Sequence, residues 1–163
     1  MTESSESGSV IQGAAAFTEH SERLVRAARM RVCLFSQTLD ARIYGGEGFA
    51  DAVREFVLKH ERTRVQVLIQ QPEVTVRSAN HLVELGRRLS SRIQFRQPSD
   101  EHRRIASEYL IGDERQVLYK ERADQLDAVW QPEAPLEARL RLRDFDAIWE
   151  YAVPAQELGE FRL

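Results

Sequence analysis

The chain has very little cysteine, little lysine and no long apolar run. Cys33 is its only cysteine and lies in the apolar run VCLF, so no internal disulfide can form and a buried, unreactive thiol is expected. No apolar run approaches the roughly 18 residues of a membrane span. The acidic, serine-rich start MTESSESGS lacks the basic and apolar regions of a secretory signal. We therefore expect a cytoplasmic protein with no membrane span.

Basic side chains are almost all arginines, because Lys59 and Lys120 are the only lysines among 23 basic residues. Guanidinium groups pair bidentately with oxyanions, so two clusters of arginines could hold phosphates. These clusters are Arg23, Arg26, Arg29 and Arg31, and Arg139, Arg141 and Arg143. The formal net charge is nevertheless -3, and acidic residues are interleaved with the arginines. Solvated helix faces are therefore the simpler interpretation, and we do not expect nucleic acid as a partner.

Length and composition indicate one soluble domain. The chain has 163 residues, of which 42% are hydrophobic and 30% charged, and it contains no internal repeat. Residues 1–13 are polar, and we expect them to form a disordered tail. Residues 14–163 then form a single α/β domain with a sizeable core.

Helical and strand-like patterns alternate through the first two thirds of the chain. The helices are predicted at 14–30, 49–57 and 76–89, and the strands at 32–35, 65–69 and 93–95. Units of about 30 residues that alternate helix and strand are typical of parallel strands joined by helices. We therefore predict a mixed, mostly parallel sheet flanked by helices.

The last third of the chain departs from this alternation. Residues 105–111 and 116–120 are strand-like and are separated by a turn short enough to make an antiparallel hairpin. An amphipathic helix over residues 140–152 closes the domain before Pro154. Trp130 lies in the expected loop between them, where it either contacts a partner or folds back over the sheet edge. Folding back is the simpler interpretation.

Polar residues follow the first two predicted strands at their carboxyl ends. Gln37 and Asp40 come after the first strand, with Tyr44 nearby, and Gln70 and Gln71 come after the second. Parallel sheets bind ligands in the crevice at the carboxyl ends of their strands, so Gln37, Asp40 and Tyr44 are candidate binding residues. The alternative is that Gln37 and Asp40 only organise the loop.

A second group of candidates belongs to the predicted third helix. His81 and Glu84 are close enough in sequence to share a helix face, and Arg77 precedes His81 by one turn. One histidine and one carboxylate without a third ligand seldom bind a metal tightly, and we expect neither a metal nor another cofactor. Arg77 and His81 remain candidates for ligand binding, unless His81 merely caps or packs the helix.

Three segments together resemble one half of the phospholipase D superfamily, in that family's order. SERLVRAARMRVCLFSQTLD resembles its first helix and strand, FADAVREFVLKHERTRVQVLIQ its second pair, and IASEYLIGDERQVLYK with FDAIWEY its core hairpin and closing helix. The segments SQTLDARIY and HLVELGRRLSSRI and the ending EL..FRL resemble an uncharacterised bacterial domain family of that superfamily, sometimes fused to N-acetyltransferases. The resemblance implies a phospholipase D-like α/β fold.

The superfamily's reaction depends on the hairpin motif His-x-Lys-x-x-x-x-Asp. Its histidine attacks the phosphorus, its lysine neutralises the phosphate, and a second histidine from another copy protonates the leaving group. Anchoring the motif on Asp113 places Ala106 at the nucleophile position and Glu108 at the lysine position. A carboxylate about 4 Å from a phosphate oxyanion costs on the order of 4 kcal/mol at an effective dielectric of about 20, so Glu108 is expected to repel the substrate. The motif is degenerate, and we assign no catalytic residue.

His102 offers a second register for the motif, since His102 and Arg104 have the spacing of the histidine and a basic residue. Tyr109 then stands where the aspartate is required. His102 also precedes the predicted strand in the segment SDEHRR, so a surface histidine is the simpler interpretation. It is retained only as a candidate binding residue.

These observations favour a non-catalytic phospholipase D-like binding or assembly module over a phosphodiesterase or nuclease with an altered active site. Single-copy members of the resembled superfamily commonly pair, so the resemblance implies a homodimer. A protein partner or a small anionic ligand would then lie at the shared crevice.

Overall fold

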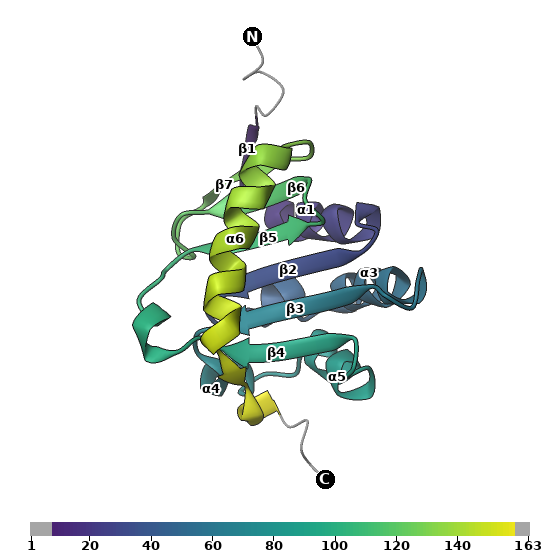
Figure 1. The fold of residues 1–163 in the computed structure, drawn as a ribbon, viewed down its shortest axis with the longest axis vertical. Helices are drawn as coiled ribbons and strands as arrows, with labels where there is room; N and C mark the ends of the chain where they lie inside the picture. The colour runs from purple at the N-terminus through teal and green to yellow at the C-terminus, as the bar shows by residue number, and fades with distance from the viewer. Residues whose placement is uncertain (1–7, 159–163) are drawn as a thin grey trace.

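The computed structural model describes residues 8–158, which form one eight-stranded sheet with helices on both faces (Figure 1). The strands lie in the order β1-β7-β6-β5-β2-β3-β4-β8. They are β1 Ser9–Gln12, β2 Arg31–Ser36, β3 Arg64–Ile69, β4 Ile93–Gln97, β5 Glu108–Gly112, β6 Gln116–Lys120, β7 Asp127–Gln131 and β8 Val153–Pro154. The helices are α1 Ala14–Ala27, α2 Ala41–Tyr44, α3 Glu47–Leu58, α4 Pro72–Thr75, α5 His81–Arg88 and α6 Pro135–Tyr151, with short 3-10 turns η2 Asp100–His102 and η3 Gln156–Leu158.

The sheet separates two apolar cores. Successive side chains of a strand point to opposite faces, so Val32 and Leu34 of β2 pack with α1 and α3, whereas Cys33 and Phe35 pack with α6. Figure 1 shows α6 crossing one face of the sheet and α1, α3 and α5 on the other. Cys33 is fully buried, and burial raises the pKa of its thiol to about 12. This position agrees with the unreactive thiol expected from the sequence.

The central strands β2, β3 and β4 are parallel, as the alternation of helix and strand predicts. The other five strand pairs in residues 8–158 are antiparallel. The α/β sheet flanked by helices is therefore confirmed, but the prediction that it is mostly parallel is wrong. The physical reason is that β5, β6 and β7 follow one another through short connections, which reverse the chain and pair the strands antiparallel.

β1 and β7 are strands that the sequence pattern did not indicate. β7 contains Trp130, which is 6% exposed and lies 5.4 Å, ring centre to ring centre, from His20 of α1. Trp130 therefore does fold inward, as expected, but from a strand and not from a loop. β1 pairs with β7, so the expected tail over residues 1–13 is wrong for residues 9–12, and residues 1–7 lie outside the described range.

The closing helix α6 is longer than predicted. It begins at Pro135, because proline is well suited to the first turn of a helix, and it ends at Tyr151 before Pro154. None of the helices within residues 8–158 combines the length and the apolar character that crossing a bilayer requires.

Candidate functional site

The start of β5 lies beside the carboxyl end of β2, where the sequence predicts a binding crevice. The two strands are antiparallel, and their register pairs Phe35 with Tyr109. Residues just before Tyr109 therefore lie next to the end of β2. Ala106, at the nucleophile position of the motif, is exposed, whereas Glu108, at the lysine position, is only 5% exposed.

Three hydrogen bonds hold the carboxyl group of Glu108. Their donors belong to the last residue of β2 and to the segment that follows this strand. The hydroxyls of Ser36 and Tyr44 donate to Oε2 at 2.7 and 2.8 Å. The backbone N–H of Gln37 donates to Oε1 at 3.0 Å. We name Glu108 and these three donors the Glu108 network. A buried carboxyl group is costly unless it is hydrogen-bonded, and these donors explain how β5 accommodates one.

Burial raises the pKa of the Glu108 carboxyl above its ordinary value of 4.5. The hydrogen bonds of the Glu108 network and the positive charge of Lys120 oppose this shift. Burial and the neighbouring carboxyl also raise the pKa of Tyr44 well above its ordinary value. Tyr44 therefore acts as a fixed hydrogen-bond donor to Glu108.

Lys120 places a positive charge one strand away from the lysine position of the motif. The register of β5 and β6 sets Glu108 directly opposite Lys120. The Lys120 side chain is largely buried, and its ammonium group lies 4.7 Å from the ring centre of Phe17 on α1. A cation is thus present near the expected phosphate position, but it faces α1 and lies opposite a carboxyl group.

Asp113, the aspartate of the motif, caps the loop that leads into β2. Its carboxylate accepts hydrogen bonds from the backbone N–H groups of Arg29, Met30 and Arg31 at 3.0, 2.9 and 3.0 Å. Asp113 also has a φ of 53°, a left-handed conformation that aspartate tolerates better than most residues. Its position beyond the last residue of β5 gives it a structural role at the end of the strand away from Ala106.

The chain's own loop 98–107 lies against the carboxyl ends of β2 and β3. The side-chain amide of Gln37 donates to the carbonyl oxygens of Ile105 and Ser107 at 3.1 and 2.9 Å. The amide of Gln70 donates to the carbonyl oxygens of His102 and Ile105 at 2.8 and 3.1 Å. Oε1 of Gln70 is buried without a hydrogen-bond partner among the described residues. Gln37 and Gln70 therefore fasten this loop to the strand ends.

Asp40 caps the short helix α2. Its carboxylate accepts from the backbone N–H of Arg42 at 2.9 Å and from the Arg42 guanidinium at 2.8 and 3.1 Å. The guanidinium hydrogen bonds hold the pKa of Asp40 below its ordinary value of 3.8. Of the three candidates after β2, Gln37 and Tyr44 converge on Glu108, and Asp40 organises the turn between them.

Arg77 and His81 do not lie on one helix face, which corrects the prediction of a continuous helix over 76–89. Asn80 caps a new helix, because its side chain accepts hydrogen bonds from the N–H groups of Leu82 and Val83. Arg77 lies in the loop before it, and His81 is an exposed residue at its start. No group of three His, Cys, Asp or Glu side chains within residues 8–158 is arranged to hold a metal ion.

His102 lines a cavity of about 300 Å³ that is bounded by loop 98–107, β5, β6 and α6. We name it the crevice cavity; its other polar lining residues are Ser107, Tyr109, Tyr119, Arg141 and Asp144. Nδ1 of His102 lies 3.3 Å from Oγ of Ser99. The Arg141 guanidinium stacks 3.7 Å from the ring centre of Tyr119. The crevice cavity therefore contains the predicted candidate His102, and its lining residue Ser107 lies between the motif positions Ala106 and Glu108.

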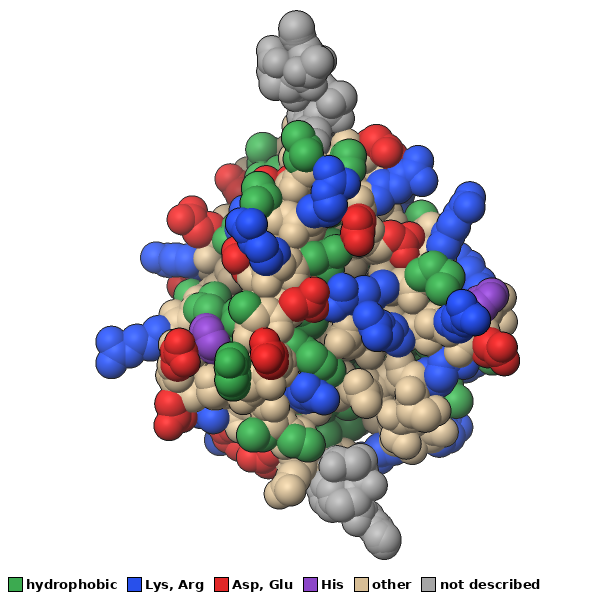
Figure 2. All heavy atoms as spheres, in the orientation of Figure 1, with side chains coloured by type: hydrophobic (Ala, Val, Ile, Leu, Met, Phe, Trp, Pro, Cys, Tyr) green, Lys and Arg blue, Asp and Glu red, His purple; other side chains and the backbone are tan. Residues whose placement is uncertain are grey.

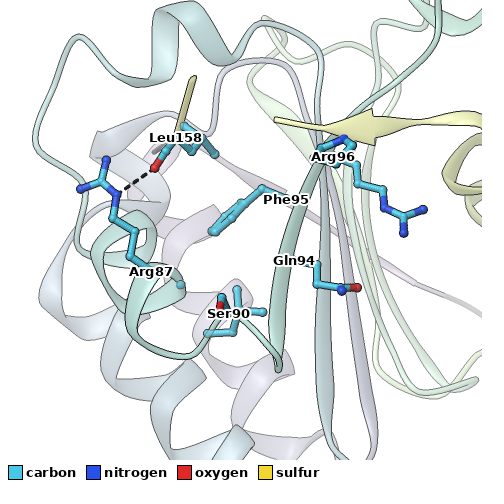
Figure 3. Close-up of a pocket in the computed structure, with 9 residues that line it drawn as sticks. Arg87, Ser90, Gln94, Phe95, Arg96 and Leu158 are labelled. Atoms are coloured by element: carbon cyan, nitrogen blue, oxygen red, sulfur yellow. Dashed lines mark hydrogen bonds between the residues drawn. The ribbon is translucent and has the colours of Figure 1, made fainter. Parts of the chain in front are cut away.

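A separate cavity of about 190 Å³ lies between α5 and β4, near the end of the described chain (Figure 3). Phe95 points from β4 toward α5, and Arg87 donates to the carbonyl oxygen of Leu158 at 2.8 Å. A Cβ atom at Gly86 would lie 2.3 Å from the Phe95 ring, so only glycine permits this approach. The cavity contains none of the candidate residues.

Sequence reasoning missed Lys120 and the α6 side of the crevice cavity. The hairpin turn carried the signal for Lys120, because a register that pairs Gly112 with Gln116 also pairs Glu108 with Lys120. Arg141 belongs to an arginine cluster that the sequence shows, but its place at the cavity depends on how α6 crosses the sheet, which no local pattern indicates.

Comparisons with known structures support the fold. The chain is similar to the phospholipase D family member Nuc from Salmonella typhimurium (TM-score 0.59, 14% identity, covering 90% of this chain and 97% of that chain). It is also similar to NucT from Helicobacter pylori (TM-score 0.63, 8% identity, 90% and 98%). TrmBL2, an archaeal chromatin protein described as showing a novel mode of DNA binding, is similar over 91% of this chain, which spans 54% of that protein (TM-score 0.64, 15% identity).

The resemblance of the fold to phospholipase D-like proteins is thus established by structure. No functionally curated protein matches the chain in sequence. A family model does match, and it extends from residue 13 to residue 161, which includes every element from α1 to η3. The chain therefore belongs to the family described as Domain of unknown function (DUF7931).

Proposed function

We propose that this protein is a non-catalytic phospholipase D-like module that binds a protein partner or a small anionic ligand at the crevice cavity, on the face of the sheet that α6 covers. One observation carries the proposal: the position of the phosphate-binding lysine is held by Glu108, whose carboxyl group is buried and hydrogen-bonded to Ser36, Gln37 and Tyr44. A side chain engaged in this way holds the start of β5 to the end of β2 and to α2, and does not bind a phosphate.

The residue at the nucleophile position also supports a non-catalytic module. The methyl group of Ala106 offers no lone pair for attack on phosphorus, and Lys120, although close to Glu108, lies against Phe17. Family chemistry through this motif therefore lacks both its nucleophile and its phosphate clamp.

The crevice cavity is the proposed place of binding. His102, Ser107 and Arg141 all line it and can donate hydrogen bonds to an anionic group. Its volume of about 300 Å³ suits a small ligand or one inserted side chain. Loop 98–107 forms one wall, so a partner at this cavity would touch the loop directly.

The alternative is a phosphodiesterase or nuclease with an altered site, favoured by the similarity to Nuc and NucT. A chromogenic phosphodiester and a mixed nucleic acid, each tested with and without divalent metals, separate the two proposals. The binding module predicts no turnover above buffer. Turnover that is abolished in His102→Ala, with the fold retained, would establish the enzyme in its place.

Assembly into a homodimer is the second part of the proposal, and it rests on the resemblance to single-copy members of the superfamily. Size-exclusion chromatography with light scattering at micromolar concentration tests it, with a dimer as the expected result. A monomer throughout this range would remove it. The net charge of -3 places nucleic acid behind protein and small anions as a ligand, although the likeness to TrmBL2 points toward it.

A further inference from the structure

A hollow lined by arginines lies where β2 and β3 begin, at the other end of these strands from the Glu108 network. Its volume is about 550 Å³. We name it the arginine hollow, and its lining includes Arg29, Arg31, Arg62, Arg64, Met30 and Leu142. Figure 2 shows several Lys and Arg side chains to the right of α6 as Figure 1 presents it, with Asp and Glu side chains among them and further Lys and Arg side chains on the left.

The register of the sheet brings these arginines together. Parallel pairing sets Arg31 at the start of β2 opposite Arg64 at the start of β3. Both side chains belong to the face of the sheet that α6 covers, because Cys33 and Leu68 of the same strands lie in that core. Like charges placed opposite one another destabilise strand pairing unless a counter-charge joins them.

Within residues 8–158, only one of the four guanidinium groups has an acidic partner. Arg31 pairs with Asp146 of α6 and donates from Nε to Gln66 at 2.8 Å. Among the described residues, we find no side-chain hydrogen bond or ion pair for Arg29, Arg62 or Arg64. These three groups are therefore available to a ligand.

Acidic side chains offset only part of the positive charge at the arginine hollow, because two carboxylates, Asp113 and Glu114, line it beside four arginines and a third, Asp146, pairs with Arg31. The carboxylate of Asp113 is already bound to three backbone N–H groups of the loop before β2. Glu114 is exposed and is the remaining acidic lining residue. The remaining positive charge comes from arginines without an acidic partner among the described residues, in a chain whose net charge is -3.

We propose that the arginine hollow binds a compact polyphosphate anion, by guanidinium forks from Arg29, Arg62 and Arg64. Guanidinium groups match phosphate oxygens bidentately, and the volume falls within the range of small-ligand sites. The hollow is also partly preorganised, because Asp113 fixes the loop that carries Arg29. A compact anion fits a concave site of this volume better than an extended nucleic acid does.

This site is independent of the proposed function at the crevice, so either proposal can fail alone. Calorimetric titration of the full chain with tripolyphosphate is the test, with Arg62→Gln/Arg64→Gln as the variant. We expect saturable binding at one site, weakened roughly tenfold or more in the variant because charge-assisted contacts are lost. Arg88→Gln/Arg139→Gln, which removes two exposed arginines elsewhere, is expected to bind like the wild type.

The proposal would be overturned by absent binding, by equal weakening in both double variants, or by orthophosphate or sulfate binding as tightly as tripolyphosphate. Tighter binding of a mixed oligonucleotide than of tripolyphosphate, with the same dependence on Arg62 and Arg64, would assign the hollow to nucleic acid and also overturn it. If the double variant does not fold, the single substitution Arg62→Gln, at an exposed residue in a turn, is also expected to weaken tripolyphosphate binding.

Discussion

The hydroxyl of Tyr44 donates a 2.8 Å hydrogen bond to Oε2 of Glu108, and both side chains are almost completely buried. The bond ties helix α2 to the first residue of β5. Glu108 stands at the lysine position of the motif of the resembled superfamily. Its side chain therefore binds to groups of its own domain. This contact links the stability of the domain to the position at which the motif of the resembled superfamily has its lysine.

Removing the Tyr44 hydroxyl tests how much the Glu108 network contributes to the free energy of unfolding. Tyr44→Phe leaves the ring in place but removes one donor to a buried carboxyl, so we expect a loss of about 1–3 kcal/mol in the free energy of unfolding. Urea unfolding measures it. Tyr151→Phe, at a residue that is 65% exposed, is the control and should be nearly neutral. Equal effects of the two substitutions would contradict the account.

The raised pKa of Glu108 predicts a definite dependence of stability on pH. The folded protein holds this proton more tightly than the unfolded chain, because burial disfavours the charged carboxylate. The favourable contribution is fully present below the ordinary pKa of 4.5 and is lost as pH rises through the raised folded value.

Glu108→Gln removes the titrating carboxyl group. The difference between wild type and variant therefore isolates the contribution of Glu108 to the pH dependence of stability. Between about pH 4 and pH 8, the wild type should lose stability relative to Glu108→Gln as pH increases. Denaturant midpoints of both proteins across this range provide the measurement. A relative gain of stability by the wild type on raising the pH would mean that its pKa is lowered by folding.

Asp113 is predicted to stabilise the fold through its three backbone contacts. Asp113→Ala removes all three hydrogen bonds and places an alanine at a φ of 53°, where no polar side chain stabilises the left-handed backbone. We therefore expect a loss of about 2–4 kcal/mol in the free energy of unfolding. Asp113→Asn keeps one acceptor oxygen and tolerates this backbone conformation, so its loss should be smaller. Chemical unfolding of both variants compares them, and losses of the same size would argue against a capping role.

The loop 98–107 should open more readily when Gln37 is truncated. Gln37→Ala removes the hydrogen bonds to Ile105 and Ser107, and local opening should become roughly tenfold more frequent. Trypsin cleavage after Arg103 or Arg104, followed by mass spectrometry, reports this opening. Gln94→Ala, at an exposed position of β4, is the control. Unchanged cleavage in Gln37→Ala would show that the loop is held by other contacts.

Local patterns in the sequence were sufficient to predict most helices, the central strands and the hairpin, because each depends on neighbours in the chain. The Gly112–Asp113 turn marked the hairpin, and it is where β5 ends. β1 could not be predicted, since its four residues form a strand only through pairing with β7, more than a hundred residues away. The polar segment before Asn80 ends one helix and begins another, which apolar spacing alone does not show.

The candidate site was predicted in part. Gln37 and Tyr44 were identified from their place after β2, and they do converge, but on Glu108. That convergence depends on which face of the sheet Glu108 occupies. A register shift of one residue in β5 would move the Glu108 side chain to the other face of the sheet, and no local sequence pattern fixes this register. The role of Lys120 follows from the same register.

The most direct test of the central claim combines two readouts on Glu108→Gln, namely stability and hydrolysis of a chromogenic phosphodiester. If Glu108 is an architectural residue of a non-catalytic module, the substitution changes the pH dependence of unfolding, and neither wild type nor variant shows turnover. Turnover by the wild-type protein that disappears in a fully folded Glu108→Gln would contradict the account, because it would make this carboxyl group part of an active site.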